Sequence, residues 1–181
     1  MADRFEEALV YALTSIGKEG LALKEEQKRA VRHIFDGNDT FVWLPTGFGK
    51  SICYECLPFV FDYALGCTQG LNARSLVIVV SPLRSLMIDQ VTSLRKRGVS
   101  AAILSGHDGI DKSLLATDSD LVIPGKYSLV FSAPEAIVGS AKWRERLLTT
   151  PLNDRIVAVA CLLYTSPSPR DATLSRMPSS A

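Results

Sequence analysis

The sequence predicts a doubly wound α/β domain with a mainly parallel sheet, and three observations lead to this fold class. Segments with strand character alternate with helical segments along most of the 181 residues, which requires crossover connections. The runs LVIVV (76–80) and IVAVA (156–160) are apolar throughout, as expected when helices cover both faces of a sheet. A chain of this length has room for one domain with a sizeable core, and not for two.

The elements follow from local periodicity. Apolar residues at helical spacing, followed by Gly17, predict a first helix over residues 5–16. A polar stretch rich in Gly and Asp separates the first part of the alternating pattern from the second. The further helices are expected at 24–35, 50–64, 85–98 and 133–148, and the strands at 40–44, 75–80, 100–105, 128–133 and 155–160.

Composition restricts the class of protein. The chain is 47% hydrophobic and 22% charged with a net charge of +1, which is typical of a globular protein and favours neither binding nor exclusion of nucleic acid. The N-terminus lacks the features of a signal peptide. The most apolar window, residues 52–65, contains Glu55, Pro58 and Asp62 and is too short to cross a membrane. We therefore expect an intracellular protein without a membrane partner.

The four cysteines are too few and too scattered for a disulfide scaffold. Cys53 and Cys56 form a C-x-x-C, but the pair lies inside a predicted helix and has no second pair. We interpret these thiols as small apolar residues; zinc binding or redox chemistry is the alternative.

The segment LPTGFGKS (44–51) connects a predicted strand to a predicted helix. A Gly-rich turn in this position directs backbone N–H groups toward one point, which favours a polyphosphate. Lys50 is placed to reach the phosphates and Ser51 to ligate Mg²⁺, while Gly47 and Gly49 allow close approach. The strict phosphate-loop pattern has Gly where this chain has Leu44, and an ordinary turn with an exposed lysine is the alternative.

Gln27 lies on the apolar face of its predicted helix, because Ala30, Val31 and Ile34 follow at helical spacing. A glutamine amide both donates and accepts, which suits the N6/N7 edge of adenine. A capping or core hydrogen bond is the alternative role.

The segment SPLRSLMIDQV (81–91), together with LKEEQ (23–27), LPTGFGKSICYE (44–55) and FSAPEAI (131–137), resembles the first RecA-like domain of RecQ-type superfamily 2 DNA helicases. The resemblance extends over residues 21–160. It implies a RecA-like P-loop fold, ATP and Mg as cofactors, and DNA, as a single strand or an unwinding junction, as partner. It also implies ATP-driven unwinding with 3′ to 5′ polarity and a nuclear location.

The resemblance assigns roles position by position. Gln27 matches the adenine-reading glutamine, and Lys50 is the catalytic lysine of a phosphate loop in which Ser51 ligates Mg. The ATP-binding loop comprises Leu44, Pro45, Thr46, Gly47, Phe48, Gly49, Lys50 and Ser51. The residues along the DNA strand are Ser81, Pro82, Leu83, Gln90, Ser132, Pro134 and Glu135.

General chemistry supports the second group, because Ser81 and Pro82 fall where a strand ends and a helix opens, at the edge where α/β sheets bind ligands. An N-cap at Ser81 with Pro82 at the first helical position is the alternative.

The chain departs from the family after residue 160. In the family this strand leads into an acidic DEAH-type box, but here Cys161, Leu162 and Leu163 follow, and the next carboxylate is Asp171. We expect a truncated product whose native sequence ends near Ala160. The expected organisation is an N-terminal helix (1–20), an incomplete helicase ATP-binding domain (21–160) and a disordered, non-native tail (161–181).

The function predicted is therefore that of an N-terminal fragment of a RecQ-like DNA helicase, itself inactive in hydrolysis and unwinding. The alternatives are a non-catalytic ATP- or DNA-binding module, and an RNA helicase or remodeller of the same superfamily. Among other candidates, the run of Arg95, Lys96 and Arg97 either contacts DNA phosphates or complements the helix dipole. We interpret His33 and His107 as surface or core residues, and Trp43 and Trp143 as packing residues.

Overall fold

The computed structural model describes residues 4–67, 75–104, 110–139, 141, 145, 148, 149 and 152–163. Its centre is a five-stranded sheet in the order β3-β2-β4-β1-β5, in which all pairings are parallel. The strands are β1 (Leu76–Val80), β2 (Ala101–Leu104), β3 (Leu115–Ala116), β4 (Leu129–Ser132) and β5 (Ile156–Cys161). The predicted α/β class with a parallel sheet is confirmed.

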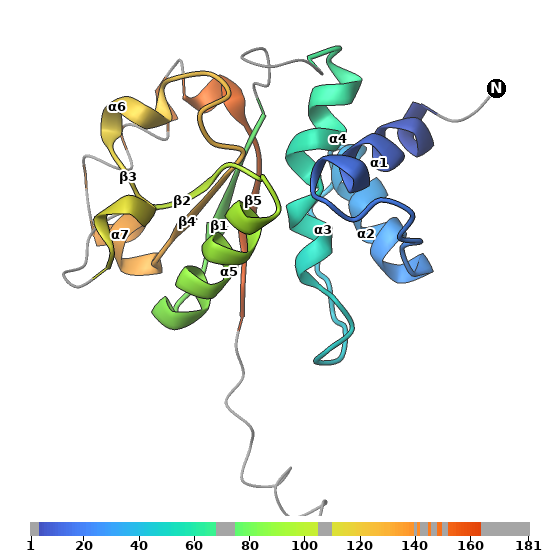
Figure 1. Ribbon diagram of the computed structural model, residues 1–181, viewed down its shortest axis with the longest axis horizontal. Helices are drawn as coiled ribbons and strands as arrows, with labels where there is room; N and C mark the ends of the chain where they lie inside the picture. The colour runs from blue at the N-terminus through green and yellow to red at the C-terminus, as the bar shows by residue number, and fades with distance from the viewer. Residues whose placement is uncertain are drawn as a thin grey trace, which may run out of the picture.

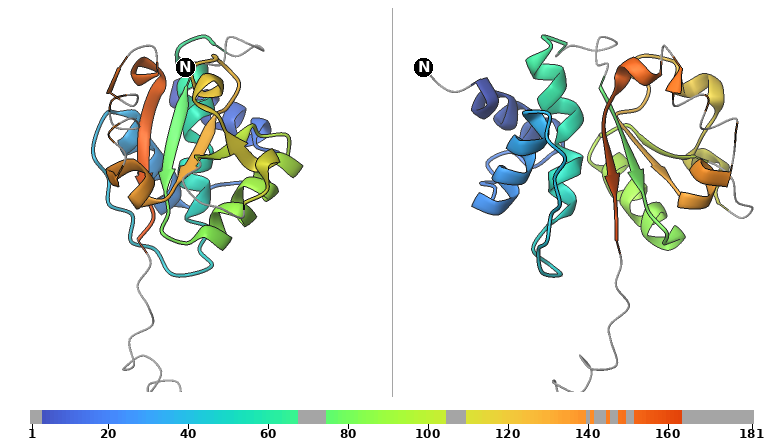
Figure 2. Two further views of the ribbon diagram at one scale, coloured as in Figure 1. Left: turned by 90° about the vertical axis from the view of Figure 1, so that its left-hand side faces the viewer. Right: turned by 180° about the vertical axis from the view of Figure 1, so that it is seen from behind.

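Helices precede, connect and flank the strands (Figure 1). The N-terminal part contains α1 (Arg4–Ser15), α2 (Glu25–Phe35), α3 (Ser51–Glu55) and α4 (Leu57–Ala64). Between and after the strands lie α5 (Arg84–Lys96), α6 (Asp118–Leu121), α7 (Pro134–Gly139) and the short 3-10 helices η2 (Lys112–Leu114) and η3 (Asn153–Arg155). Figures 1 and 2 show α1 to α4 gathered on the β5 side of the molecule.

The central strands are buried on both faces, as their uninterrupted apolar sequences predict. In β1, Val77 and Val79 join the core beneath α1 to α5, whereas Leu76 and Ile78 join a second core. That second core contains Leu121 of α6 and is flanked by Ile137 of α7. The chain is therefore wound on both sides of the sheet.

Two predicted elements are wrong in detail. The segment 40–44 is not a strand, because the sheet ends at β5 and offers these residues no neighbour among the described ones. The helix predicted over 50–64 is divided at Cys56 into α3 and α4. Pro58 stands at the start of α4 and has no N–H to continue the preceding helical ladder, which explains the division.

The ends of other predicted elements also differ. Strand β5 continues to Cys161, which pairs with Val80. The strand therefore ends one residue later than residue 160, where the sequence predicted its end. The polar stretch contains η2, β3 and α6, which the sequence did not predict. Only α7 of the helix expected over 133–148 is well described, and residues 164–181 of the expected disordered tail lie outside the described residues.

Candidate functional site

The phosphate-binding loop expected at residues 44–51 forms a turn before α3, in which the Phe48 N–H donates to the Pro45 carbonyl at 3.2 Å. Gly47 and Gly49 have φ values of +81° and +83°, a region that residues with a side chain rarely adopt. Within the described part of the chain, the N–H groups of Gly47, Gly49, Lys50 and Ser51 have no hydrogen-bond acceptor. Unpaired N–H donors next to a helix N-terminus favour an anion.

The Lys50 side chain folds back over its own loop. Its Nζ donates to the carbonyl oxygens of Leu44 at 2.8 Å and Pro45 at 3.0 Å. The ammonium group therefore lies on the same loop as the unpaired N–H groups of residues 47 and 49–51. These carbonyl contacts are exposed, so phosphate oxygens with full negative charge can compete for the ammonium group.

The Gln27 amide holds the loop in place. Its Nε2 donates to the carbonyls of Phe48 at 2.8 Å and Gly49 at 3.1 Å, and its Oε1 accepts from the backbone N–H of Lys24 at 2.9 Å. Gln27 is buried, as its place on the apolar face of the helix predicted. The capping interaction considered for this residue is therefore present, and the same amide also contacts the loop.

Lys24 is a residue that the sequence reasoning missed. Its Nζ lies 3.7 Å from the centre of the Phe48 ring, within range of a cation–π interaction. Lys24 thus adds a second positive charge beside the loop. A basic residue three positions before a buried glutamine was the available signal.

The residues expected along the DNA strand gather at the carboxyl ends of β1 and β4. These strands are neighbours, Val80 is in register with Ser132, and the Ser81 N–H donates to the Ser132 carbonyl at 2.9 Å. A cavity of about 260 Å³ opens beside them and is lined by Pro82, Arg84, Met87, Ala133 and Glu135. The two sequence motifs, far apart in the chain, therefore meet at one place.

The residues of the first of these motifs differ in exposure and in hydrogen bonding. Helix α5 begins at Arg84 with Leu83 as its N-cap residue, so the alternative of an N-cap at Ser81 is wrong. The buried Ser81 hydroxyl lies 3.4 Å from the Leu83 N–H, which rigidifies the turn. Leu83 is 47% exposed, whereas Gln90 accepts a hydrogen bond from the Tyr54 hydroxyl at 3.3 Å. Among the residues of this motif that were expected along the DNA strand, Pro82 and Leu83 are thus the exposed ones.

For a divalent metal, the protein offers few ligands. The Ser51 hydroxyl has no hydrogen-bond partner among the described residues, which leaves it available. No group of three or more His, Cys, Asp or Glu side chains lies together in the described part of the chain. The donors therefore fit an ion held mainly by phosphate oxygens and water, with Ser51 as a protein ligand.

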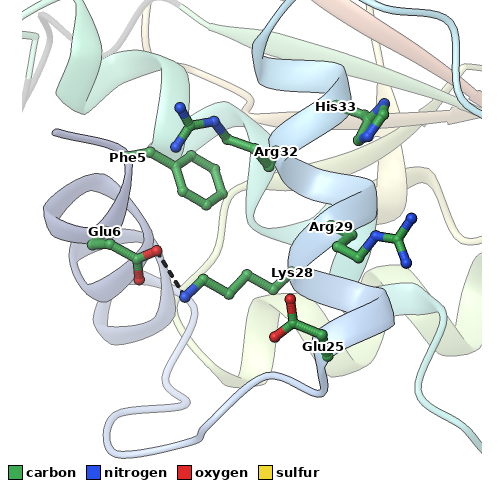
Figure 3. A pocket seen from close by; sticks show the side chains of 7 residues that line it. All are labelled: Phe5, Glu6, Glu25, Lys28, Arg29, Arg32 and His33. Carbon is green, nitrogen blue, oxygen red and sulfur yellow. Dashed lines mark ion pairs between the residues drawn. The ribbon is translucent and has the colours of Figure 1, made fainter. Parts of the chain in front are cut away.

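A second cavity, of about 250 Å³, lies between α1 and α2 and is lined by Phe5, Glu6, Glu25, Lys28, Arg29, Arg32 and His33 (Figure 3). Charged side chains of both signs meet there, and Lys28 pairs with Glu6 at 2.7 Å. His33 is exposed, which confirms its interpretation as a surface residue, whereas His107 lies outside the described residues.

The basic run at the end of α5 is mostly structural. Arg95 donates to the carbonyls of Ala101 and Ser113, each at 2.7 Å. Arg97 donates to the Ile16 carbonyl at 3.1 Å and pairs with buried Glu55 at 3.0 Å. Only Lys96 is exposed, so these side chains do not form a basic surface for DNA.

The cysteine pair and the tryptophans are the remaining residues for which the sequence suggested a role. Cys53 and Cys56 are buried free thiols, and burial raises the pKa of Cys53 to about 11 and raises that of Cys56 further, which confirms the apolar interpretation. Trp43 is 82% exposed, so its interpretation as a packing residue is wrong. The reason is that the strand expected at 40–44 did not form. Trp143 lies outside the described residues.

Comparison with known proteins identifies the family of the chain. Residues 24–153 match the DEAD/DEAH box helicase family, and the chain belongs to that family. It is 44% identical over 84 residues to ATP-dependent helicase wrn-1 of Caenorhabditis elegans, covering 46% of this chain and 7% of that protein. It is 36% identical over 124 residues to ATP-dependent helicase SGS1 of Saccharomyces cerevisiae, covering 68% of this chain and 8% of that protein.

A bacterial relative is ATP-dependent DNA helicase RecQ of Haemophilus influenzae, 28% identical over 117 residues, covering 65% of this chain and 17% of that protein. The predicted resemblance to RecQ-type helicases is therefore confirmed. The chain spans less than a fifth of the length of each of these three relatives. Among the helices of the described part, none is long and apolar enough to cross a membrane.

Proposed function

We propose that this chain is an ATP-binding lobe of a RecQ-type DNA helicase, whose whole protein couples ATP hydrolysis to 3′ to 5′ strand separation. The observation that carries the proposal is the group of unpaired N–H donors at residues 47 and 49–51 beside the Lys50 ammonium group. This arrangement suits a nucleotide polyphosphate. ATP would place its phosphates on these donors and supply the bond that hydrolysis cleaves.

Binding of a fluorescent ATP analogue tests the proposal. Lys50→Ala removes a charge-assisted contact and should weaken binding by about 10- to 150-fold. Lys112→Ala is the matched control, because Lys112 is an exposed lysine on η2, away from the loop. Equal binding by the parent and Lys50→Ala would reject the assignment.

Mg²⁺ belongs to the same proposal, with Ser51 as its protein ligand. The free hydroxyl of Ser51 at the start of α3 supports this role. Ser51→Ala should therefore weaken the Mg²⁺ dependence of nucleotide binding while leaving binding in EDTA unchanged. An identical Mg²⁺ titration for both proteins would remove Ser51 from the site.

We assign the DNA strand to the region at the ends of β1 and β4 that carries Ser81, Pro82, Leu83, Ser132, Pro134 and Glu135, and to Gln90 of α5. Pro82, Leu83 and Glu135 are exposed there, whereas Ser81 and Ser132 are buried. The meeting of the two motifs at neighbouring strand ends supports this assignment. Contacts of this kind hold the phosphate backbone and do not read base sequence. The partner is single-stranded DNA or an unwinding junction. A nuclear location is part of the proposal because DNA is the partner.

A second candidate function is a non-catalytic ATP- or DNA-binding module. It is favoured by one observation: Leu162 and Leu163, rather than carboxylates, follow β5. Phosphate release by the purified chain distinguishes this candidate from an active lobe.

A further inference from the structure

Tyr54 of α3 contacts both α5 and β4. It is 6% exposed, its hydroxyl donates to Gln90 Oε1 at 3.3 Å, and its ring packs edge-on against Phe131 with 6.3 Å between the ring centres. Gln90 belongs to α5, which begins directly after Leu83, and Phe131 directly precedes Ser132 at the end of β4. One side chain therefore contacts both elements that carry the residues we assign to the DNA strand.

The helix that carries Tyr54 also begins at the phosphate loop. Its first residue is Ser51, and the N–H groups of residues 49–51, which have no acceptor among the described residues, lie at its start. Because α3 has only five residues, little more than one helical turn, a shift of the loop carries Tyr54 with it. Glu55 attaches the same helix to Arg97, which follows α5, at 3.0 Å. Movements of the loop and of α5 are therefore linked.

The hydrogen bond between Tyr54 and Gln90 is long. Bonds from a hydroxyl to an oxygen acceptor are usually about 2.7–2.8 Å, so a distance of 3.3 Å leaves room for this bond to shorten. Phosphates bound to the loop would fix α3, and a DNA strand bound beside Pro82 and Leu83 would fix the start of α5. The contact can therefore differ between the empty protein and the protein with both ligands, which coupling between two ligands requires.

We propose that Tyr54 is a positioning residue that couples nucleotide binding at residues 44–51 to DNA binding at the ends of β1 and β4. The coupling rests on the proposed function, because it needs both ligands, but it concerns binding and requires no hydrolysis. The first ligand orders the Tyr54 contacts, so the second meets an ordered surface and binds more tightly. Thermodynamic linkage makes the factor equal in both directions. A tyrosine that only fills the core gives no such factor.

Two titrations measure the coupling. A fluorescent, non-hydrolysable ATP analogue is titrated with and without saturating oligo(dT), and labelled oligo(dT) is titrated with and without the analogue. In the parent, each ligand should tighten the binding of the other at least about fivefold. Tyr54→Phe keeps the ring on Phe131 and removes the hydroxyl, and it should lower the factor to below about twofold.

Two further variants separate coupling from structural support. Tyr127→Phe removes a hydroxyl from a half-buried tyrosine beside the second core, and it should keep the parent factor. Gln90→Leu removes the acceptor. The double variant with Tyr54→Phe should have the same factor as either single variant, because all three lack the same bond. Loss of structural support alone would weaken binding of the analogue equally with and without DNA, and would leave the factor unchanged.

The outcomes distinguish this coupling from the proposed function. If the parent binds both ligands and neither changes the affinity for the other, the coupling is rejected and the two sites stand. A parent factor that persists in Tyr54→Phe likewise overturns the role of Tyr54. If the parent binds no analogue, or no DNA, the proposed function fails and the coupling fails with it.

Discussion

Gly47 and Gly49 have the same backbone conformation but different surroundings. Both have positive φ, so any side chain is strained at either position. A Cβ on Gly47 would meet nothing within 4 Å, whereas a Cβ on Gly49 would lie 3.0 Å from Gln27 Nε2. The loop is therefore fitted to the Gln27 amide at one glycine and open at the other.

Gly47→Ala should lower the free energy of unfolding by about 1–2 kcal/mol through backbone strain alone. Gly49→Ala should cost the same plus about 1–3 kcal/mol, because it displaces the amide that bonds to Phe48 and Gly49. Urea unfolding of the two variants measures the difference. Equal losses would mean that Gln27 does not hold the loop.

Gln27 also carries the prediction of adenine selectivity. Guanine presents O6 where adenine presents its N6 donor, so the amide would be mismatched. Because the amide is bonded to the loop in this structure, reading adenine requires it to exchange partners. ATP should compete for the site better than GTP in the parent, and Gln27→Ala should lose this preference. If the preference survives, the residue acts only on the loop.

The buried thiols give a prediction about pH. Burial raises the pKa of Cys53 to about 11, so its thiol is almost entirely neutral at pH 8. At pH 8, iodoacetamide should therefore label exposed Cys161 and half-buried Cys67, but not Cys53 or Cys56. All four should react in guanidinium. Rapid labelling of four thiols in the folded protein would contradict the assigned burial.

At the scale of elements, the sequence predicted those parts that depend on local pattern and burial. The apolar runs of β1 and β5 and the helical period of α1 need no distant information. The segment 40–44 has an equally strong strand pattern, but a strand also needs a neighbour, and pattern cannot supply one. The break at Cys56 was predictable from Pro58, because proline lacks the N–H that would continue the preceding helix.

Site residues, like the elements, were predictable only where local sequence specifies them without a distant partner. The loop at 44–51 and the position of Gln27 were predictable because backbone chemistry and helix period specify them. The roles of Lys24 and Arg97 were not, because their partners, Phe48 and Glu55, are distant in the chain. Arg97 and Lys18 both pair with the Glu55 carboxylate, at 3.0 and 3.6 Å. These ion pairs connect α3, which contains Glu55, to the C-terminal end of α5 and to the segment that follows α1.

Arg97→Ala should lower the free energy of unfolding by about 3–5 kcal/mol, because it leaves the buried Glu55 charge without its main partner. Lys96→Ala is the control, and a change at this exposed neighbour should stay within about 0.5 kcal/mol. Adding Glu55→Gln to Arg97→Ala should recover part of the loss. Thermal unfolding of the three variants checks this, and equal melting of Arg97→Ala and Lys96→Ala would rule out a structural role for the pair.

At the scale of the whole molecule, hydrolysis needs parts that act together: a cradle for phosphate, a carboxylate that fixes Mg²⁺, another that orients water, and an arginine that stabilises the transition state. We assign the first to residues 44–51, and Cys161, Leu162 and Leu163 stand at the end of β5, where we expect the second. An arginine finger alone is worth about 10³ to 10⁵ in rate. Strand separation further requires one lobe to move against another.

We therefore predict that the purified chain binds ATP but neither releases phosphate above the rate of a Lys50→Ala control nor unwinds a forked duplex. Single-stranded DNA should not stimulate it, because no carboxylate at the end of β5 links the DNA surface to attack by water. Phosphate release is measured with and without DNA for both proteins. DNA-stimulated release that disappears in Lys50→Ala would show that an acidic residue elsewhere takes the missing role, and the chain would then be an active lobe rather than a binding module.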